Sequence, residues 1–428
     1  MKPRRNHGES AAPQAFSRQR PHRVAEFEEN QMLTNHRSST SKTLRAGIAA
    51  LLIAGIAAGV TACAPSSAAA PAKPAVQQAL DQAVAGGLPG AVAEVHDSAG
   101  TWWGRAGLAD AGTGRLPMRG DQFRVGSITK AFTAAAVLRL VEAGVLNLDD
   151  TVTKWLPGVV RGNGNDGAAI TVRHLLNQTS GLANPSVDDQ EMLNNFSGKD
   201  YMQHRFDNLG AEDIVRITMK YPPYYAPGAG WRYSNTNYFL LGMIIEKATG
   251  RGYADEIQRL VIDPLGLADT YVAGPEFEVR GPHGRLYSKL WSADPDAPVY
   301  DVTDMNPSWA GAAGAIVSTT ADLSRFVTAM AGGELLPPAL HELMWTTVST
   351  DGAGWIPQTR YGSGGVFEQR LPCGVTVYGT GGAVQGGFTY AMASRDGGHT
   401  LVTTVNGDWN NPIGALLAIT SAEFCPTI

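Results

Sequence analysis

The stretch "RVGSITKAF" places Ser127 three residues ahead of Lys130, at the start of a long apolar helical pattern. Residues three apart on a helix share a face, so the two side chains can meet. A lysine held beside a serine in a partly desolvated pocket can lose its charge and accept the hydroxyl proton, which makes the serine a nucleophile. A second S-x-x-K match at Ser39 and Lys42 shows that this spacing alone is weak evidence.

A second pair of polar residues strengthens this interpretation. In "PGAGWRYSNTNYFLLG", Tyr233 and Asn235 lie two residues apart on a predicted turn before a helix, so both side chains can face one cleft. A tyrosine next to an ammonium group can move a proton, and an asparagine can hold an amide group of a ligand. Because Ser127 opens a predicted helix, the helix dipole would favour negative charge that develops beside its backbone N–H. The pattern indicates acyl transfer through a serine.

Other hydrolytic designs find less support in the sequence. No G-x-S-x-G motif is present, and "HELMW" has Trp345 where a zinc helix would need a second histidine. The nine histidines form no cluster with ligand spacing. We therefore expect neither a metal nor a cofactor.

The elements that must position these residues fall into three blocks. A helical pattern at 75–87 and a hairpin pattern at 90–107 begin the domain, and strand patterns with a final helix close it. The middle, from about 131 to 265, is dominated by helical patterns that end in glycine. We predict an α+β domain over 76–428: one antiparallel sheet flanked by helices, with a mostly helical subdomain at roughly 140–310 and a cleft between the two parts.

The N-terminal region predicts export from the cytoplasm. Residues 46–62 are uncharged and apolar, follow Lys42 and Arg45, and end in "VTAC" at Cys63. This favours a signal peptide over 32–62 with lipidation at Cys63; a single membrane-anchoring helix is the alternative. Residues 1–31 are too long and too mixed in charge for a signal, so translation is predicted to begin at Met32.

The expected location of the domain is the outer face of the cell membrane or the medium, with the Ala/Pro/Ser-rich residues 64–75 as a spacer. The chain has 428 residues, 43% hydrophobic and 17% charged, an ordinary globular composition. Residues 1–62 hold nine of the 34 basic and four of the 39 acidic side chains, so the remainder has a formal charge of −10. Such a surface repels a phosphate backbone, so we expect no nucleic-acid partner.

Two cysteines remain once Cys63 is assigned to the signal. In an oxidising compartment, Cys373 and Cys425 are expected to form a disulfide, and two buried thiols are the alternative.

Taken together, "FRVGSITKAF", "LLNQTSGL", "YAPGAGWRYSNTNY", "PLGLADTY", "SWAGAAGAIVSTTADLSRF" and "CGVTVYGTGGAVQGGFTYA" occur in the order found in a known family. From about residue 79 to Cys425 the chain resembles the serine D,D-carboxypeptidases and class C β-lactamases, and most closely secreted actinomycete D-alanyl-D-alanine carboxypeptidases. The resemblance implies a β-lactamase-like fold, Ser127 as nucleophile, Lys130 and Tyr233 as its proton-handling partners and Asn235 as a ligand for the substrate amide.

The same resemblance implies an oxyanion hole formed by the backbone N–H groups of Ser127 and Ala383. Trp309 matches an aromatic position that lines the family's cleft, although a core tryptophan is an alternative. The implied substrates are D-Ala-D-Ala stem peptides of peptidoglycan or β-lactams, and the implied membrane contact is the lipid anchor.

One motif departs from the family. Where the family has Lys or His, then Thr or Ser, then Gly, this chain has Thr380, Gly381 and Gly382. The cation that helps hold a substrate carboxylate is missing, and only Thr380 could supply a hydroxyl. This leaves alternatives open: a carboxypeptidase or β-lactamase, an esterase of the same fold, a penicillin-binding regulatory lipoprotein without turnover, or a structural envelope lipoprotein.

Overall fold

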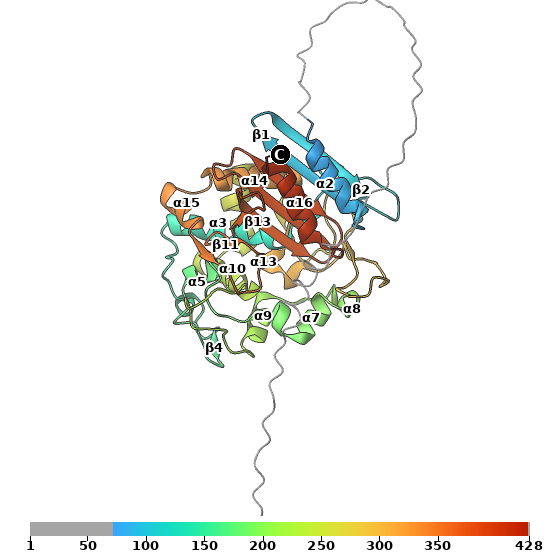
Figure 1. Cartoon of the computed structure of the whole chain (residues 1–428). Coiled ribbons are helices and arrows are strands. Elements are labelled where there is room, and N and C mark those ends of the chain that lie inside the picture. Colours follow the sequence, from blue (N-terminus) through green and yellow to red (C-terminus); the bar gives the residue numbers. More distant parts are fainter. Residues whose placement is uncertain (1–71, 427–428) are drawn as a thin grey trace, which may run out of the picture.

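The structure is a computed structural model that describes residues 72–426 (Figure 1). The predicted signal at 32–62, the lipidation site at Cys63 and most of the spacer lie outside the described residues. Within 72–426, no helix is both long enough and apolar enough to cross a bilayer.

The centre of the domain is one antiparallel sheet to which both ends of the chain contribute. Its strands, in sheet order, are β10 (Thr347–Ser349), β11 (Thr359–Gly362), β12 (Phe367–Arg370), β13 (Thr376–Val384), β14 (Gly387–Ala393), β15 (Thr400–Val405), β1 (Gly90–Asp97) and β2 (Gly100–Gly107). The N-terminal hairpin joins the C-terminal strands through β1 and β15, in the register Ala91↔Val405. The predicted antiparallel sheet with strands from both termini is confirmed.

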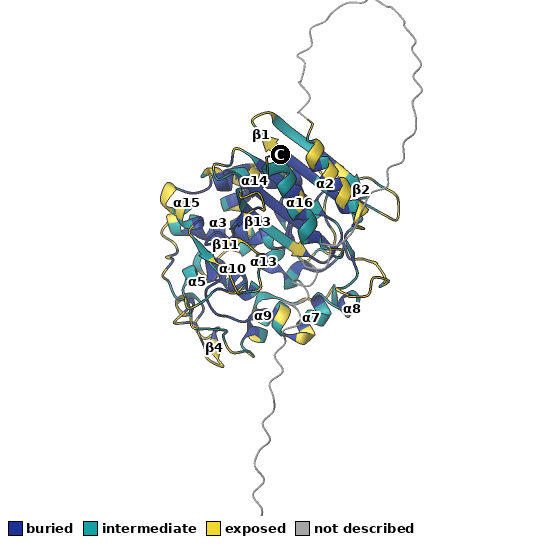
Figure 2. Cartoon of the chain, viewed as in Figure 1, coloured by how far each residue is buried: buried dark blue, intermediate teal, exposed yellow. Residues whose placement is uncertain are grey.

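Two helical layers cover the two faces of this sheet. The strands and helices in the middle of the domain are mostly coloured as buried in Figure 2. Every residue of β14 is buried, and its side chains alternate between the two layers. Phe388 and Met392 pack in the cluster that includes side chains of α2 (Pro74–Ala85) and α16 (Pro412–Phe424). Ala391 and Ala393 pack in the cluster that includes α3 (Thr129–Glu142) and α14 (Thr320–Gly332). The period-two alternation of a strand buried on both faces explains this division.

Residues 108–318 hold most of the helices of the described part and its three small sheets. The remaining helices are α4 (Val152–Trp155), α5 (Val172–Leu176), α6 (Pro185–Asp188), α7 (Gln190–Phe196), α8 (Tyr201–His204), α9 (Ala211–Thr218), α10 (Asn235–Thr249), α11 (Tyr253–Ile257), α12 (Asp263–Leu265), α13 (Gly311–Gly314) and α15 (Pro338–Met344), with the 3₁₀ turns η1 (Gly126–Ile128) and η3 (Pro307–Trp309) and the π-helix η2 (Gln258–Ile262). The small sheets are β3 (Phe123–Arg124), β9 (Ile316–Ser318) and β6 (Tyr271–Val272); β4 (Arg161–Gly162) and β5 (Asn165–Asp166); and β7 (Tyr287–Ser288) and β8 (Tyr300–Asp301).

Helix α3 runs through the middle of the domain. Its sequence "TKAFTAAAVLRLVE" is rich in alanine and leucine, which favour helix, and 11 of its 14 residues are buried. It packs against α10 and α13 on the helical side and lies in one cluster with α14. A lysine in the first turn of such a helix is removed from water.

Strand β13 is paired along only part of one of its two edges. Strand β12 pairs with its first residues, from Thr376↔Arg370 to Gly379↔Phe367, whereas the stretch Thr380–Val384 pairs with β14 alone among the described strands. The other edge of this stretch faces the turn η1. Its backbone N–H and C=O groups on that edge are therefore available to a ligand.

The predicted disulfide is confirmed. Cys373, in the turn between β12 and β13, is bonded to Cys425 at the end of α16. The bond closes a segment with a sequence separation of 52, which on the loop-entropy account stabilises the fold by about 4 kcal/mol.

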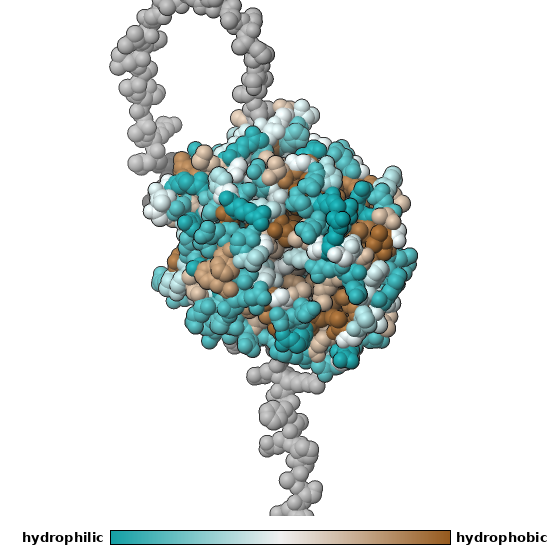
Figure 3. Space-filling model, turned by 180° about the vertical axis from the view of Figure 1, so that it is seen from behind, coloured by the Kyte–Doolittle hydropathy of each residue, from teal (hydrophilic) through white to brown (hydrophobic). Residues whose placement is uncertain are grey.

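The surface carries few large apolar side chains. On the face seen in Figure 3, hydrophobic residues form small groups within a mostly hydrophilic surface. The most exposed large ones in the described part are Met118, Val299, Leu116, Phe206 and Phe277.

Candidate active site

Ser127 lies in η1, the turn that leads directly into α3. The side chain of Lys130 returns along the first turn of α3, and its Nζ lies 3.0 Å from Ser127 Oγ and 2.7 Å from the Ala313 carbonyl oxygen. The predicted i, i+3 contact is thus present, and Ala313 is a further partner from α13.

Burial sets the electrostatics of Lys130. The side chain is 1% exposed, and desolvation lowers its pKa well below the usual value. In the described part of the chain it forms no ion pair; its polar contacts are Ser127 and the Ala313 carbonyl. A neutral amine that donates one N–H to Ala313 can use its lone pair to accept the Ser127 hydroxyl proton.

Tyr233 reaches the same oxygen from the helical part of the chain. Its hydroxyl donates to Ser127 Oγ at 2.8 Å, and Lys130 Nζ lies 4.9 Å from the centroid of its ring. Burial raises the pKa of Tyr233 well above the usual value, so the phenol is protonated at neutral pH. The buried Gln178 holds the adjoining turn, since its Oε1 accepts from the Ser234 backbone N–H at 3.0 Å.

Two glycines bring the nucleophile turn against β13. Gly126 has φ +53°, and a Cβ there would lie 2.3 Å from the Ala383 carbonyl oxygen. A Cβ on Gly382 would lie 2.0 Å from the Val125 carbonyl oxygen and 2.7 Å from the Ser127 nitrogen. Only glycine permits this approach, which sets the Ala383 backbone beside the turn that carries Ser127. The arrangement fits the predicted oxyanion hole.

Asn235 is the first residue of α10 and is fixed by two residues that the sequence analysis missed. Its Nδ2 donates to Ser186 Oγ at 3.1 Å, and its backbone N–H donates to Asn184 Oδ1 at 3.3 Å. Asn184 and Ser186 lie at the start of α6. No motif marks them, because the contact joins segments about 50 residues apart.

The side chains of the altered motif on β13 make contacts on both faces of the sheet. Thr380 is 1% exposed, and its hydroxyl donates to the Gly365 carbonyl oxygen at 3.1 Å. A Cβ on Gly381 would lie 2.9 Å from the ring of Tyr390, so this position points toward the α16 side of the sheet. The assignment of Thr380 and Gly381 to substrate binding stays a prediction, and Gly365 is a partner of Thr380 that the sequence did not reveal.

Trp309 ends η3 and packs against the cluster that contains α3, with its ring centroid 6.1 Å from that of Phe196. Its indole Nε1 is buried and has no hydrogen-bond partner in the part of the chain that the structure describes. The assignment of Trp309 to substrate binding stays a prediction.

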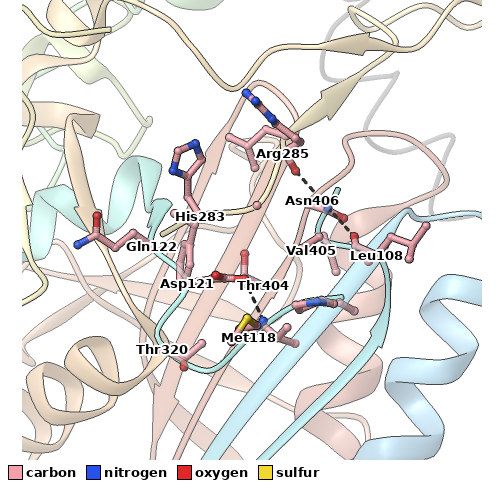
Figure 4. Close-up of a pocket in the computed structure, with 18 of the residues that line it drawn as sticks. Leu108, Met118, Asp121, Gln122, His283, Arg285, Thr320, Thr404, Val405 and Asn406 are labelled. Atoms are coloured by element: carbon pink, nitrogen blue, oxygen red, sulfur yellow. Dashed lines mark hydrogen bonds between the residues drawn. The ribbon is translucent and has the colours of Figure 1, made fainter. Parts of the chain in front are cut away.

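Two other features of the structure lie away from these residues. A pocket beneath the N-terminal hairpin is lined by Met118, Val405 and Asn406 among others, and none of the candidate catalytic residues contributes to it (Figure 4). Asn406 there donates to the carbonyl oxygens of Leu108 and Arg285.

The second feature is an acidic cluster that could hold a metal ion. Ligand atoms of Asp97, His399 and Glu423 lie within 4.8 Å of one another. Lys73 Nζ lies 2.7 Å from Asp97 and 2.6 Å from Glu423, so an ammonium group already neutralises the two carboxylates. We therefore interpret these residues as an ion-pair network and not as a metal site.

Comparison with known proteins decides the family. The profile of the Beta-lactamase family matches residues 76–423. The chain belongs to this family. Esterase EstB of Burkholderia gladioli is 40% identical over 190 residues, which cover 42% of this chain and 46% of the esterase. Penicillin-binding protein 4* of Bacillus subtilis (strain 168) is 31% identical over 285 residues, which cover 63% of this chain and 58% of that protein. The chain thus spans about half the length of these two relatives.

A solved β-lactamase-like structure covers more of the chain. The D-stereospecific amidohydrolase from Streptomyces sp. is 43% identical, with a TM-score of 0.76, and the match covers 84% of this chain and 100% of that one. The predicted β-lactamase-like fold is confirmed, and this member of the Beta-lactamase family is a serine hydrolase of the penicillin-recognising type.

Proposed function

We propose that the protein hydrolyses amides or esters of D-configured acyl groups whose leaving group carries no carboxylate, through an acyl-enzyme on Ser127. The observation that carries the proposal is a contrast between the nucleophile group and the altered motif on β13. Ser127, Lys130 and Tyr233 form a connected hydrogen-bonded group, whereas Thr380, at the family's cation position, is buried against Gly365.

The proposed reaction has two balanced halves. Ser127 Oγ attacks the substrate carbonyl carbon while its proton passes to the neutral Lys130 amine, and the backbone N–H groups of Ser127 and Ala383 receive the oxyanion. When the intermediate collapses, the C–N or C–O bond breaks, and the leaving group takes the proton from Lys130 by way of the Tyr233 hydroxyl. Water then attacks the ester, its proton follows the reverse route, and Ser127 is regenerated with a carboxylic acid as product.

Recognition of the acyl side is supported by the open edge of β13. A short substrate can add to Thr380–Val384 as a further strand, with main-chain hydrogen bonds to the edge. Asn235, held by Ser186, supplies a side-chain amide on the opposite wall.

The similarity to the Streptomyces D-stereospecific amidohydrolase, over the whole of that chain, supports the amide and the D configuration. The identity to esterase EstB favours an esterase as the second candidate. Neither an amidase nor an esterase that acts on these substrates has to bind a carboxylate on the leaving group. D-Ala-D-Ala peptides and β-lactams, which carry a carboxylate, are then poorer substrates.

The test is steady-state kinetics on three matched compounds: D-alanine p-nitroanilide, D-alanine methyl ester and the dipeptide D-alanyl-D-alanine. The missing charged hydrogen bond is worth about 1.5–3 kcal/mol. We expect kcat/KM for both neutral substrates to exceed that for the dipeptide by about tenfold or more, and L-enantiomers to react at least about tenfold more slowly. Ser127→Ala should abolish turnover of all three. Equal or better turnover of the dipeptide contradicts the proposal.

For the location of the enzyme, we propose the outer face of the cell membrane, with a lipid on Cys63. The apolar stretch before Cys63 and the spacer after it support this. Metabolic labelling with a fatty acid, compared between the native chain and Cys63→Ala, tests it, and unchanged labelling contradicts it.

A further inference from the structure

The side chain of the catalytic tyrosine is held in place mainly by contacts with other aromatic rings. Tyr233 lies in neither a helix nor a strand, and its only hydrogen bond among the described residues is to Ser127. A phenol on irregular backbone keeps one orientation only if its ring is packed.

Trp355 provides that packing from another segment of the chain. Its indole stacks on the Tyr233 ring, with centroids 4.6 Å apart and planes at 18°. Tyr361 meets the same ring edge-on at 6.3 Å. Trp355 belongs to the loop between β10 and β11, at the edge of the sheet, whereas Tyr233 belongs to the helical part.

Two further rings contact Trp355: Trp231 at 5.6 Å and Tyr361 at 6.3 Å. Trp231 also meets the Tyr361 ring at 5.4 Å. Trp231 is two residues before Tyr233, so one short segment contributes two rings to a four-ring cluster with Trp355 and Tyr361. Offset and edge-to-face pairs of this kind are each worth about 0.5–1.5 kcal/mol beyond their buried area.

We propose that Trp355 is a positioning residue that aims the Tyr233 hydroxyl at Ser127 Oγ. The proposal rests on the function proposed for Ser127 and Tyr233 and adds a residue that no motif indicates. Trp355 acts through the tyrosine and not on the substrate. Its indole Nε1 is buried and has no hydrogen-bond partner within residues 72–426, so the proposal depends on the ring.

Because the Trp355 Nε1 donates no hydrogen bond in the described part of the chain, substitutions at this position test the ring alone. Trp355→Phe keeps a stacked ring and removes no hydrogen bond, so kcat should stay within about threefold of the native value. Trp355→Leu removes the ring, and kcat should fall about 30-fold with KM changed less than threefold, because an ill-placed proton donor affects the chemical step. Trp355→Met serves if the leucine variant does not fold.

A double-mutant cycle with Tyr233→Phe separates positioning from general damage. If Trp355 acts only through the Tyr233 hydroxyl, Trp355→Leu should cost less than about threefold in the Tyr233→Phe background. Trp345→Leu is the matched control, because Trp345 is also buried with an unpartnered Nε1 and an edge-on tyrosine, Tyr378 at 5.7 Å. It should leave kcat within about twofold.

These measurements distinguish a positioning role of Trp355 from general damage to the fold. A 30-fold loss that persists in the Tyr233→Phe background, or equal losses for Trp345→Leu and Trp355→Leu, overturns the positioning role. So does full activity of Trp355→Leu while Ser127→Ala is inactive. If Ser127→Ala itself keeps the native rate, the proposed function fails, and that result is separate from the fate of Trp355.

Discussion

Two lysines of this enzyme have pKa values that are shifted in opposite directions. Lys130 in α3 is buried without a carboxylate, and desolvation lowers its pKa well below the usual value. Lys73, just before α2, is also desolvated, but its hydrogen bonds and charge attraction to Asp97 and Glu423 outweigh that effect, so its pKa is raised. The same amine is a candidate base in one place and a permanent cation in the other.

The difference shows that the partners, rather than burial alone, decide what a lysine does. A carboxylate within hydrogen-bond distance stabilises the ammonium form, whereas a hydroxyl and a carbonyl in dry surroundings do not stabilise it enough. Lys130 has only the second kind of neighbour.

Replacing the candidate base should have the largest effect. Lys130→Arg keeps a positive charge but cannot accept a proton at neutral pH, so kcat/KM for a neutral amide should fall by about 10³. Lys73→Arg keeps the ion pairs, and its kcat/KM for the same amide should stay within about twofold of the native value. Steady-state kinetics on both variants makes the comparison, and a Lys130→Arg enzyme with more than a tenth of native activity would show that the base is another group.

The pH profile should reveal the lowered pKa of Lys130. Only the neutral amine accepts the serine proton, so the rate is lost as pH falls through the pKa of Lys130. A lysine with its ordinary pKa would give a rise of about 100-fold in kcat/KM between pH 7 and pH 9, since the neutral fraction grows tenfold per unit. We expect a rise of less than tenfold, measured with a substrate that does not titrate in this range. A 100-fold rise would assign Lys130 an unshifted pKa.

Removing the other lysine should affect stability instead of rate. Its raised folded-state pKa stabilises the fold below about pH 10.5, and this contribution is lost as pH rises through the folded-state pKa. Lys73→Met leaves the buried Glu423 without its cation and should lower the free energy of unfolding by about 2 kcal/mol at pH 7. Urea unfolding measures this. Lys154→Met is the control, because its pair with Asp150 is exposed and worth about 0.3–0.5 kcal/mol; equal losses would contradict the expectation.

Adding a cation near Lys130 should have the smallest effect, and only on one substrate class. Thr380→His should raise the ratio of kcat/KM for D-alanyl-D-alanine to that for the neutral amide by about tenfold, which corresponds to about 1.4 kcal/mol of recovered transition-state binding. Thr380→Val, which removes the hydroxyl that donates to Gly365 but adds no charge, should leave the ratio unchanged. Equal responses of the two substrates to Thr380→His would show that position 380 does not read a carboxylate.

The sequence predicted those parts of the site that depend on local spacing or on recognisable motifs. Ser127 and Lys130 meet because one helical turn brings them together, and Tyr233 joins them as the family order implied. The strands at both termini followed from alternation, and the disulfide followed from two leftover cysteines.

Contacts between distant segments could not be predicted. Gly365 takes the Thr380 hydroxyl, and Trp355 stacks on Tyr233, through packing that no pattern in either segment indicates. The direction of Gly381 is a similar case: restoring the family hydroxyl with threonine would set a Cβ 2.9 Å from Tyr390, so that change requires the ring to move.

The unpaired stretch Thr380–Val384 also bears on self-association. Open strand edges usually invite pairing with other chains and promote aggregation. This edge is about five residues long, roughly 17 Å, and it lies inside the sheet order, between the end of β12 and the turn to β14, with η1 against it. The sheet order ends at β10 and β2, so sheets of two copies would pair at those strands and not at the inner stretch proposed to bind a substrate backbone.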